Sequence, residues 1–130
     1  MEPEAAALPP LLRAGIAEFN AGEYFACHET LEALWKAERG PVRALYQGIL
    51  QLAVALYHLQ RGNYRGTLVL LARARANLAP FAPAWQGVDV AGLLVAAEAI
   101  EREVRALGPE RLGQFDRALI PRVRLVAVPR

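Results

Sequence analysis

Apolar residues recur every three or four positions along most of the chain, and glycine or proline interrupts this spacing repeatedly. The spacing places apolar side chains on one face of a helix, and glycine and proline end helices. Sustained β-strand alternation is not seen before the last ten residues. We therefore predict an all-α fold, a compact bundle of about five helices. The predicted helices run from residue 9 or 10 to 20, from 23 to 38, from 42 to 61, from a cap at 63 to 78, and from a cap at 89 to 108.

The predicted helices are bounded by residues that suit helix ends. Asn63 and Asp89 are good N-cap residues, because their side-chain oxygens can accept a hydrogen bond from the first helical turn. Gly22 and Gly62 follow two of the predicted helices and allow the left-handed backbone that commonly ends a helix.

A faint internal repeat relates two of the turns between helices. Asn20-Ala-Gly-Glu-Tyr24 aligns with Gln60-Arg-Gly-Asn-Tyr64 at an offset of 40 residues. Each copy joins one helix to the next, so we predict two helical hairpins. Two copies are fewer than the roughly three that a solenoid needs, which favours a compact bundle. We assign residues 1–118 to a single bundle domain and residues 119–130 to an extended or mobile tail.

The composition sets the broad class of the protein. The 130 residues are 55% hydrophobic and 22% charged, which is enough apolar material for one domain with its own core. Polar residues interrupt the most hydrophobic stretch before it reaches the roughly 20 apolar residues of a membrane span, and the N-terminal residues lack a basic leader. We expect a cytoplasmic protein without a membrane segment. The single Cys27 excludes a disulfide within one chain.

Charge is unevenly distributed between the two halves of the chain. Residues 1–60 contain four basic and seven acidic side chains, a net charge of −3, whereas residues 61–130 contain eleven arginines and six acids, a net charge of +5. This division favours a weak contact with an anionic partner. No helix carries the continuous arginine stripe of a typical nucleic-acid binder, so we do not expect nucleic acid as a partner.

Polar residues on two otherwise apolar helices suggest a functional site. His28 lies at the edge of the apolar face of its helix, and Glu32 follows one turn later. On the most apolar helix, Gln47, Gln51 and His58 form a narrow polar stripe. Unpaired polar groups are costly in an apolar interior, so these side chains must pair with each other, with water or with a ligand. If the two faces meet, they form one polar pocket.

Such a pocket would contain the groups that acid–base chemistry requires. His28 or His58 would act as the general acid or base, and Glu32 would orient it or hold a metal ion, while the glutamines position a substrate. Two histidines and a carboxylate also match the ligands of zinc or non-haem iron. Serine is absent and no other side chain is a compelling nucleophile, so a nucleophilic triad is not expected. The alternatives are a solvent-exposed polar strip or a purely structural network.

Four motifs occur in order along the chain: Phe19-Asn20-x-Gly22-x-Tyr24, His28-Glu29-x-Leu31-Glu32-x-x-Trp35, Tyr46-Gln47-Gly48-x-x-Gln51 and His58-x-x-x-Gly62-Asn63. Together they resemble an uncharacterised helical family, domain of unknown function family 309, over residues 14–78. The resemblance implies a small all-α bundle found mainly in prokaryotes, without an established activity. It also implies that Glu29, Trp35, Gln47 and Gln51 belong to the site with the two histidines and Glu32.

Two functions remain open from the sequence. The first is binding of a small ligand or metal ion in the polar pocket, with or without catalysis. The second is a helical interaction module, in which the repeated hairpins and the arginine-bearing tail bind a protein partner or a second copy of the chain. The sequence identifies no specific cofactor, substrate or metal.

Overall fold

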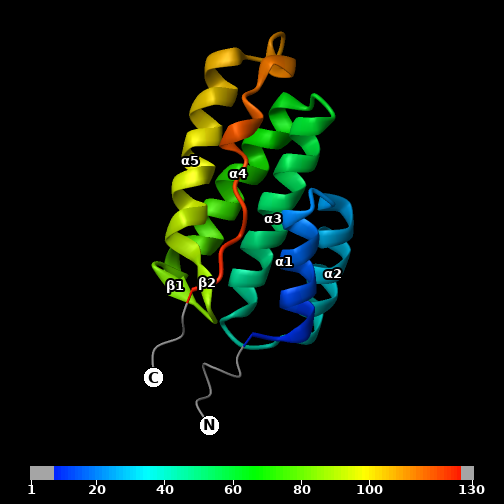
Figure 1. The fold of residues 1–130 in the computed structure, drawn as a ribbon, viewed down its shortest axis with the longest axis vertical. Helices are drawn as coiled ribbons and strands as arrows, with labels where there is room; N and C mark the ends of the chain where they lie inside the picture. The colour runs from blue at the N-terminus through cyan, green and yellow to red at the C-terminus, as the bar shows by residue number, and fades with distance from the viewer. Residues whose placement is uncertain (1–7, 127–130) are drawn as a thin grey trace.

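The computed structural model describes residues 8–126 and is all-α apart from one small hairpin, as predicted (Figure 1). Each of the five long helices begins and ends within two residues of its predicted bounds. They are α1 (Pro10–Asn20), α2 (Tyr24–Ala37), α3 (Arg43–Gln60), α4 (Tyr64–Leu78) and α5 (Val90–Leu107). None of the helices in this part of the chain is both long and apolar enough to span a bilayer.

The repeated sequence at the two turns produces the same backbone structure twice. Gly22 has a φ of 78° and Gly62 a φ of 74°, the left-handed conformation that glycine adopts most easily. In each turn the residue after the glycine, Glu23 or Asn63, donates its backbone N–H to the carbonyl five residues earlier at 2.9 Å. This bond is typical of a Schellman end. The α1–α2 and α3–α4 hairpins are therefore joined by equivalent turns.

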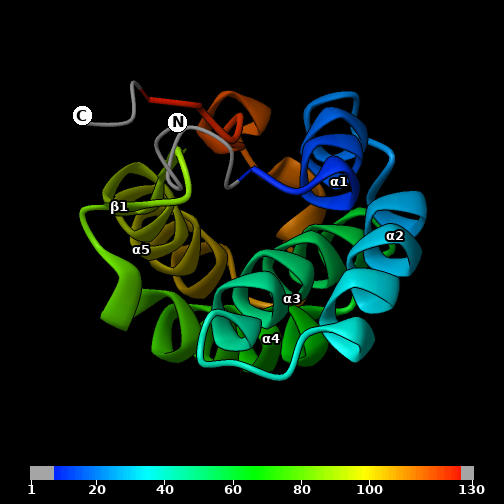
Figure 2. The ribbon, with the colours of Figure 1, turned by 90° about the horizontal axis from the view of Figure 1, so that it is seen from below.

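Helix α3 is the central helix of the bundle. It lies between α2 and α4 (Figure 2), and most of its residues are buried, as its nearly continuous apolar sequence predicts. Fully buried leucines from all five helices contribute to a common core. They include Leu12, Leu31, Leu52, Leu71 and Leu93.

A short hairpin between α4 and α5 was not predicted from the sequence. After the 3₁₀ turn Ala79–Phe81, strands β1 (Ala84–Trp85) and β2 (Val88–Asp89) pair in an antiparallel arrangement. Gln86 and Gly87 form the connection, with φ of 50° and 79°, as a two-residue type I′ turn requires. The Tyr46 hydroxyl donates to the Gln86 side-chain oxygen at 2.8 Å, which attaches this turn to α3.

The C-terminal segment crosses the open side of the helical arc. Viewed along the helices, α5 and α1 lie at the two ends of the arc, and the segment passes between them (Figure 2). It includes two 3₁₀ turns, Leu112–Gln114 and Arg117–Leu119, and continues without helix through residue 126. Residues 127–130 of the predicted tail lie outside the described residues.

Candidate functional site

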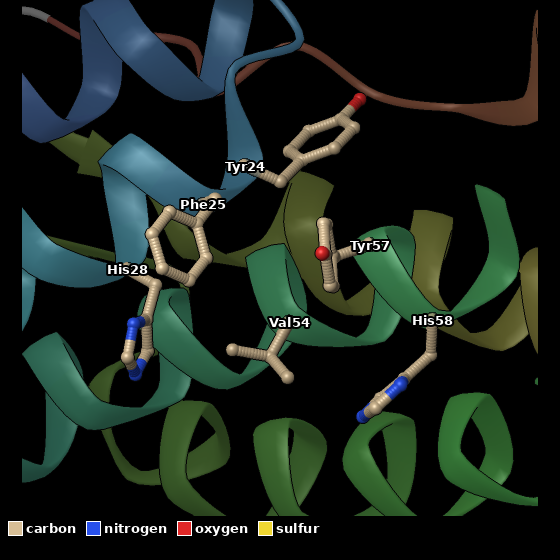
Figure 3. Close-up of a pocket in the computed structure, with 6 residues that line it drawn as sticks. All are labelled: Tyr24, Phe25, His28, Val54, Tyr57 and His58. Carbon is tan, nitrogen blue, oxygen red and sulfur yellow. The ribbon is translucent and has the colours of Figure 1, made fainter. Parts of the chain in front are cut away.

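The two histidines singled out in the sequence line a common groove between α2 and α3. The groove has a volume of about 170 Å³ and opens to the surface. Figure 3 shows the imidazole of His28 near one end and that of His58 near the other, with Val54 between them. The lining residues are Tyr24, Phe25 and His28 from α2, and Val54, Tyr57 and His58 from α3.

The walls of the groove are mainly aromatic. The ring of Phe25 lies 6.1 Å from that of Tyr57 and 6.2 Å from that of His28, measured between centroids. The guanidinium of Arg61 lies 5.5 Å from the centre of the Tyr57 ring, within the range of a cation–π interaction. Phe25 is 58% exposed although it is large and apolar. The groove therefore presents apolar surface with polar groups at its edges.

His58 also takes part in the α3–α4 turn. Its Nδ1 atom lies 3.2 Å from Nδ2 of Asn63, which is a donor, so Nδ1 accepts. The proton of a neutral His58 ring is therefore on Nε2. The Asn63 side-chain oxygen accepts from the backbone N–H of Gly66 at 2.9 Å and caps α4 as predicted. The bond to Gly66 fixes the Asn63 side chain, and the bond from Asn63 in turn fixes the orientation of the His58 ring.

His28 belongs to a row of three polar side chains along α2. Its Nε2 atom lies 3.9 Å from Oε2 of Glu32, and Oε1 of Glu32 lies 3.7 Å from Nζ of Lys36. All three side chains are partly exposed, so these contacts contribute little to stability. Glu32 thus lies beside His28, as its spacing suggested, but is outside the lining of the groove.

The structure places the predicted glutamine stripe elsewhere. Gln51 is 8% exposed, and its Oε1 atom accepts a hydrogen bond from Nδ2 of Asn77 on α4 at 2.7 Å. Gln47 is half-buried on α3, and neither glutamine lines the groove. Because α3 lies between two helices, its polar residues are divided between the α2 side and the α4 side.

The two remaining residues implied by the family resemblance also lie outside the groove lining. Glu29 is exposed on α2. The indole of Trp35 is covered by the guanidinium of Arg43 at 4.0 Å, and Arg43 Nε donates to the Trp35 carbonyl at 3.0 Å. Trp35 and Arg43 together connect the end of α2 to the start of α3.

The described residues contain no group of three His, Cys, Asp or Glu side chains arranged to hold a metal ion. His28, Glu32 and His58 therefore do not form a shared metal centre in this arrangement. The two histidines lie at opposite ends of the apolar groove, with Val54 between them.

Sequence reasoning missed the apolar members of the groove, Phe25, Val54 and Tyr57. Their spacing did carry a signal, because residues three or four apart share a helix face. Phe25 precedes His28 by three positions, and Val54 precedes Tyr57 and His58 by three and four. The prediction was based on polar residues, because buried polar groups are costly and usually have a partner or a ligand. Aromatic residues on a helix more often pack in a core, so they were not assigned to the site.

Cys27 lies close to the groove in sequence but is fully buried. Burial raises the pKa of its thiol from the ordinary 9.0 to about 12, and the nearby Glu18 carboxylate contributes in the same direction. The thiolate is the reactive form of cysteine, so this thiol is not a catalytic nucleophile near neutral pH.

We expect the folded protein to resist alkylation of Cys27 by iodoacetamide at pH 8, and the denatured protein to react rapidly. The same pKa affects stability, since the folded state holds the thiol proton more tightly than the unfolded state. Its contribution is complete below pH 9 and is lost as the pH rises towards 12. Mass spectrometry after timed alkylation, with and without denaturant, checks the first point. Equal rates in the two states would contradict burial of the thiol.

The part of the chain that contains the groove is similar to a known protein family. Residues 12–70 match the family model described as "Domain of unknown function (DUF309)". This part of the chain is similar to the DUF309 family. The match covers most of α1, all of α2 and α3, and the first part of α4, so both walls of the groove lie within the matched residues.

Two curated bacterial relatives match part of the chain. The uncharacterized protein YpuF of Bacillus subtilis is 46% identical over 61 residues, which are 45% of this chain and 35% of YpuF. An uncharacterized protein of Aquifex aeolicus is 24% identical over 81 residues, 62% of this chain and 24% of that protein. The chain thus spans about a third or less of the length of these relatives, and their names state no activity.

Proposed function

We propose that the chain is a non-catalytic interaction module and that the groove between α2 and α3 receives one aromatic side chain of a partner polypeptide. The observation that carries this proposal is the size of the groove together with its aromatic lining.

The volume of the groove suits one ring better than a whole small molecule. An engineered apolar cavity of about 150 Å³ in another protein binds benzene, whereas pockets for drug-sized ligands measure about 300–1,000 Å³. The groove measures about 170 Å³. A single side chain from a larger partner fits this space, and the partner would make its remaining contacts outside the groove.

The lining matches the residue types that dominate protein–protein binding energy. Aromatic residues and arginine are enriched at such positions; Phe25 and Tyr57 line the groove, and Arg61 lies next to the Tyr57 ring without lining it. Phe25 leaves 58% of its surface exposed, and covering it with a partner would remove apolar area from water. His28 and His58 add polar atoms at the two ends, where they can orient the partner.

Acid–base catalysis by the histidines is the weaker candidate. Nε2 of His58 can donate to a ligand, which is the feature that favours it. However, Glu32 lies between His28 and Lys36 on the surface of α2 and does not line the groove. Asn63 orients His58, but a catalytic histidine also needs a substrate held beside it, and the groove offers room for little more than a ring.

Selection from a random peptide library on the immobilised protein tests the proposal. We expect enriched peptides to share Phe, Tyr or Trp at one position, because one ring fills the groove. Phe25→Ala should weaken their binding by about 30-fold or more, the effect of losing about 2 kcal/mol at an interface hot spot. The matched control is Val95→Ala, which truncates an apolar side chain 70% exposed on α5 and should leave binding unchanged.

Two results would contradict the interaction role. One is a selection that enriches no aromatic position. The other is a set of enriched peptides that bind Phe25→Ala and the unmodified protein equally well, which would place their site on another surface.

A further inference from the structure

The C-terminal segment over residues 120–126 is held as an extended peptide by a side chain far away in the sequence. Nδ2 of Asn20, the last residue of α1, donates to the Val123 carbonyl at 3.1 Å. The Val123 N–H donates in turn to Oδ1 of Asn20 at 2.7 Å. One asparagine therefore satisfies both backbone groups of one residue, as a neighbouring β-strand would do.

Strand β2 holds the other edge of the same segment. The Asp89 N–H donates to the Arg124 carbonyl at 2.9 Å, and the Val126 N–H donates to the Gly87 carbonyl at 2.7 Å. Val88 and Leu125 form an antiparallel bridge between these bonds. The segment is thus added to the hairpin as a third strand, the way in which many domains recognise extended peptides.

One side chain of the segment, that of Val123, is buried in the core. Val123 is 3% exposed, whereas Arg122 and Arg124 on either side of it are exposed. Val123 is the one buried residue from 122 to 126, since Leu125 is 47% exposed. Backbone hydrogen bonds attach the segment, and burial of the Val123 side chain in the core favours an aliphatic residue at this position.

The segment leaves space beside it. One hollow of about 370 Å³ separates it from the start of α5, and a second of about 440 Å³ separates it from α1. Arg122 borders both hollows. Within the segment, Val123 is buried and Ile120 also packs against the core, while the two hollows leave Arg122 with open space on both sides.

We propose that Asn20, β2 and the part of the core that buries Val123 form a binding site for an extended peptide, occupied here by the chain's own residues 120–126. The partner for this site is the same segment of a second copy of the chain. An identical segment reproduces the contacts of Asn20 and β2 described above without any change in the site, which makes exchange of an element between copies a low-cost route to association.

A complementation experiment with two full-length variants tests this exchange. Asn20→Ala weakens the site but keeps a tail of natural sequence. Val123→Asp keeps the site but places a charge where the core is apolar. We expect each variant alone to be a monomer and an equal mixture to form a 1:1 dimer, because the tail of the first variant enters the site of the second.

The matched control for this mixture is Val126→Asp, which introduces the same charge where the side chain is 39% exposed. Its tail should stay in its own site, so its mixture with Asn20→Ala should remain monomeric. Sedimentation of the mixtures distinguishes the outcomes. A Val123→Asp mixture that stays monomeric while both variants are folded would overturn the proposal.

Hydrogen exchange of the unmodified protein gives a second test that does not depend on a variant folding. The backbone N–H groups of Asp89, Val123 and Val126 report directly on the attachment of the segment. We expect them to exchange at least about tenfold faster than those of the α3 core, because the segment opens separately from the bundle. Equal protection would show that the segment leaves only on global unfolding, and would overturn the proposal.

Discussion

Replacing Leu31 by alanine is expected to lower the free energy of unfolding by about 2–5 kcal/mol, the range for large cavities in a core. Leu31 is fully buried on α2 and faces Gly15 of α1, where an added Cβ would lie 2.5 Å from a Leu31 methyl group. The two helix backbones are held close together there, so the helices cannot easily collapse into the cavity. Urea unfolding followed by circular dichroism measures the loss.

The matched control is Leu11→Ala on α1, where the side chain is 42% exposed. The chemical change is the same, but little buried volume is lost, so we expect a change within about 0.5 kcal/mol. A loss of similar size for Leu11→Ala and Leu31→Ala would contradict the assignment of Leu31 to the core between α1 and α2.

Gly48→Ala is expected to destabilise the protein by about 1–3 kcal/mol, although alanine favours a helix by about 1 kcal/mol over glycine. A Cβ at Gly48 would lie 2.7 Å from Cγ of Leu78 and 3.3 Å from the carbonyl oxygen of Ala74. Leu78 is fully buried and the Ala74 oxygen is backbone, so neither can move away freely. Thermal unfolding of the variant measures the effect.

A second substitution identifies the cause of that loss. Leu78→Ala alone removes a buried side chain and should cost about 2–5 kcal/mol. In the double variant the new methyl group at position 48 occupies part of the space that Leu78 leaves. We therefore expect a combined loss smaller than the sum of the single losses. Strict additivity would show that the contact between Gly48 and Leu78 is not what limits the approach of α3 and α4.

The helices were predictable because their boundaries are encoded locally. Asn63 and Asp89 cap α4 and α5 as predicted, each accepting from the N–H three residues later. Gly22 and Gly62 take the left-handed conformation expected after a helix end. In each case a few neighbouring residues determine the backbone, so no knowledge of the rest of the fold is needed.

The hairpin and the path of the C-terminal segment depend on distant contacts. Strands of two residues are too short to show alternation, and β2 is completed by a segment more than 30 residues later. Asn20 looked like an ordinary helix end, but it binds Val123, 103 residues away. Spacing along the chain carries no signal for such pairs.

The candidate site was predictable only in part. Helical spacing placed His28 on the face of α2 that borders α3, and His58 on a face of α3 that reaches the same groove. The same reasoning could not tell which side of α3 would meet α2, so Gln51 was grouped with the histidines although it bonds to Asn77 of α4. Which faces of three adjacent helices meet is a property of the packed bundle.

The central claim is that the groove between α2 and α3 accepts one aromatic ring. A titration of the isotopically labelled protein with N-acetylphenylalaninamide, followed by two-dimensional NMR, tests it most directly, with N-acetylglycinamide as the control compound. The account predicts saturable shifts of the Phe25, His28, Tyr57 and His58 signals with the aromatic compound, and no such shifts with the control. Shifts confined to α4 and α5, or no saturable shifts at all, would contradict it.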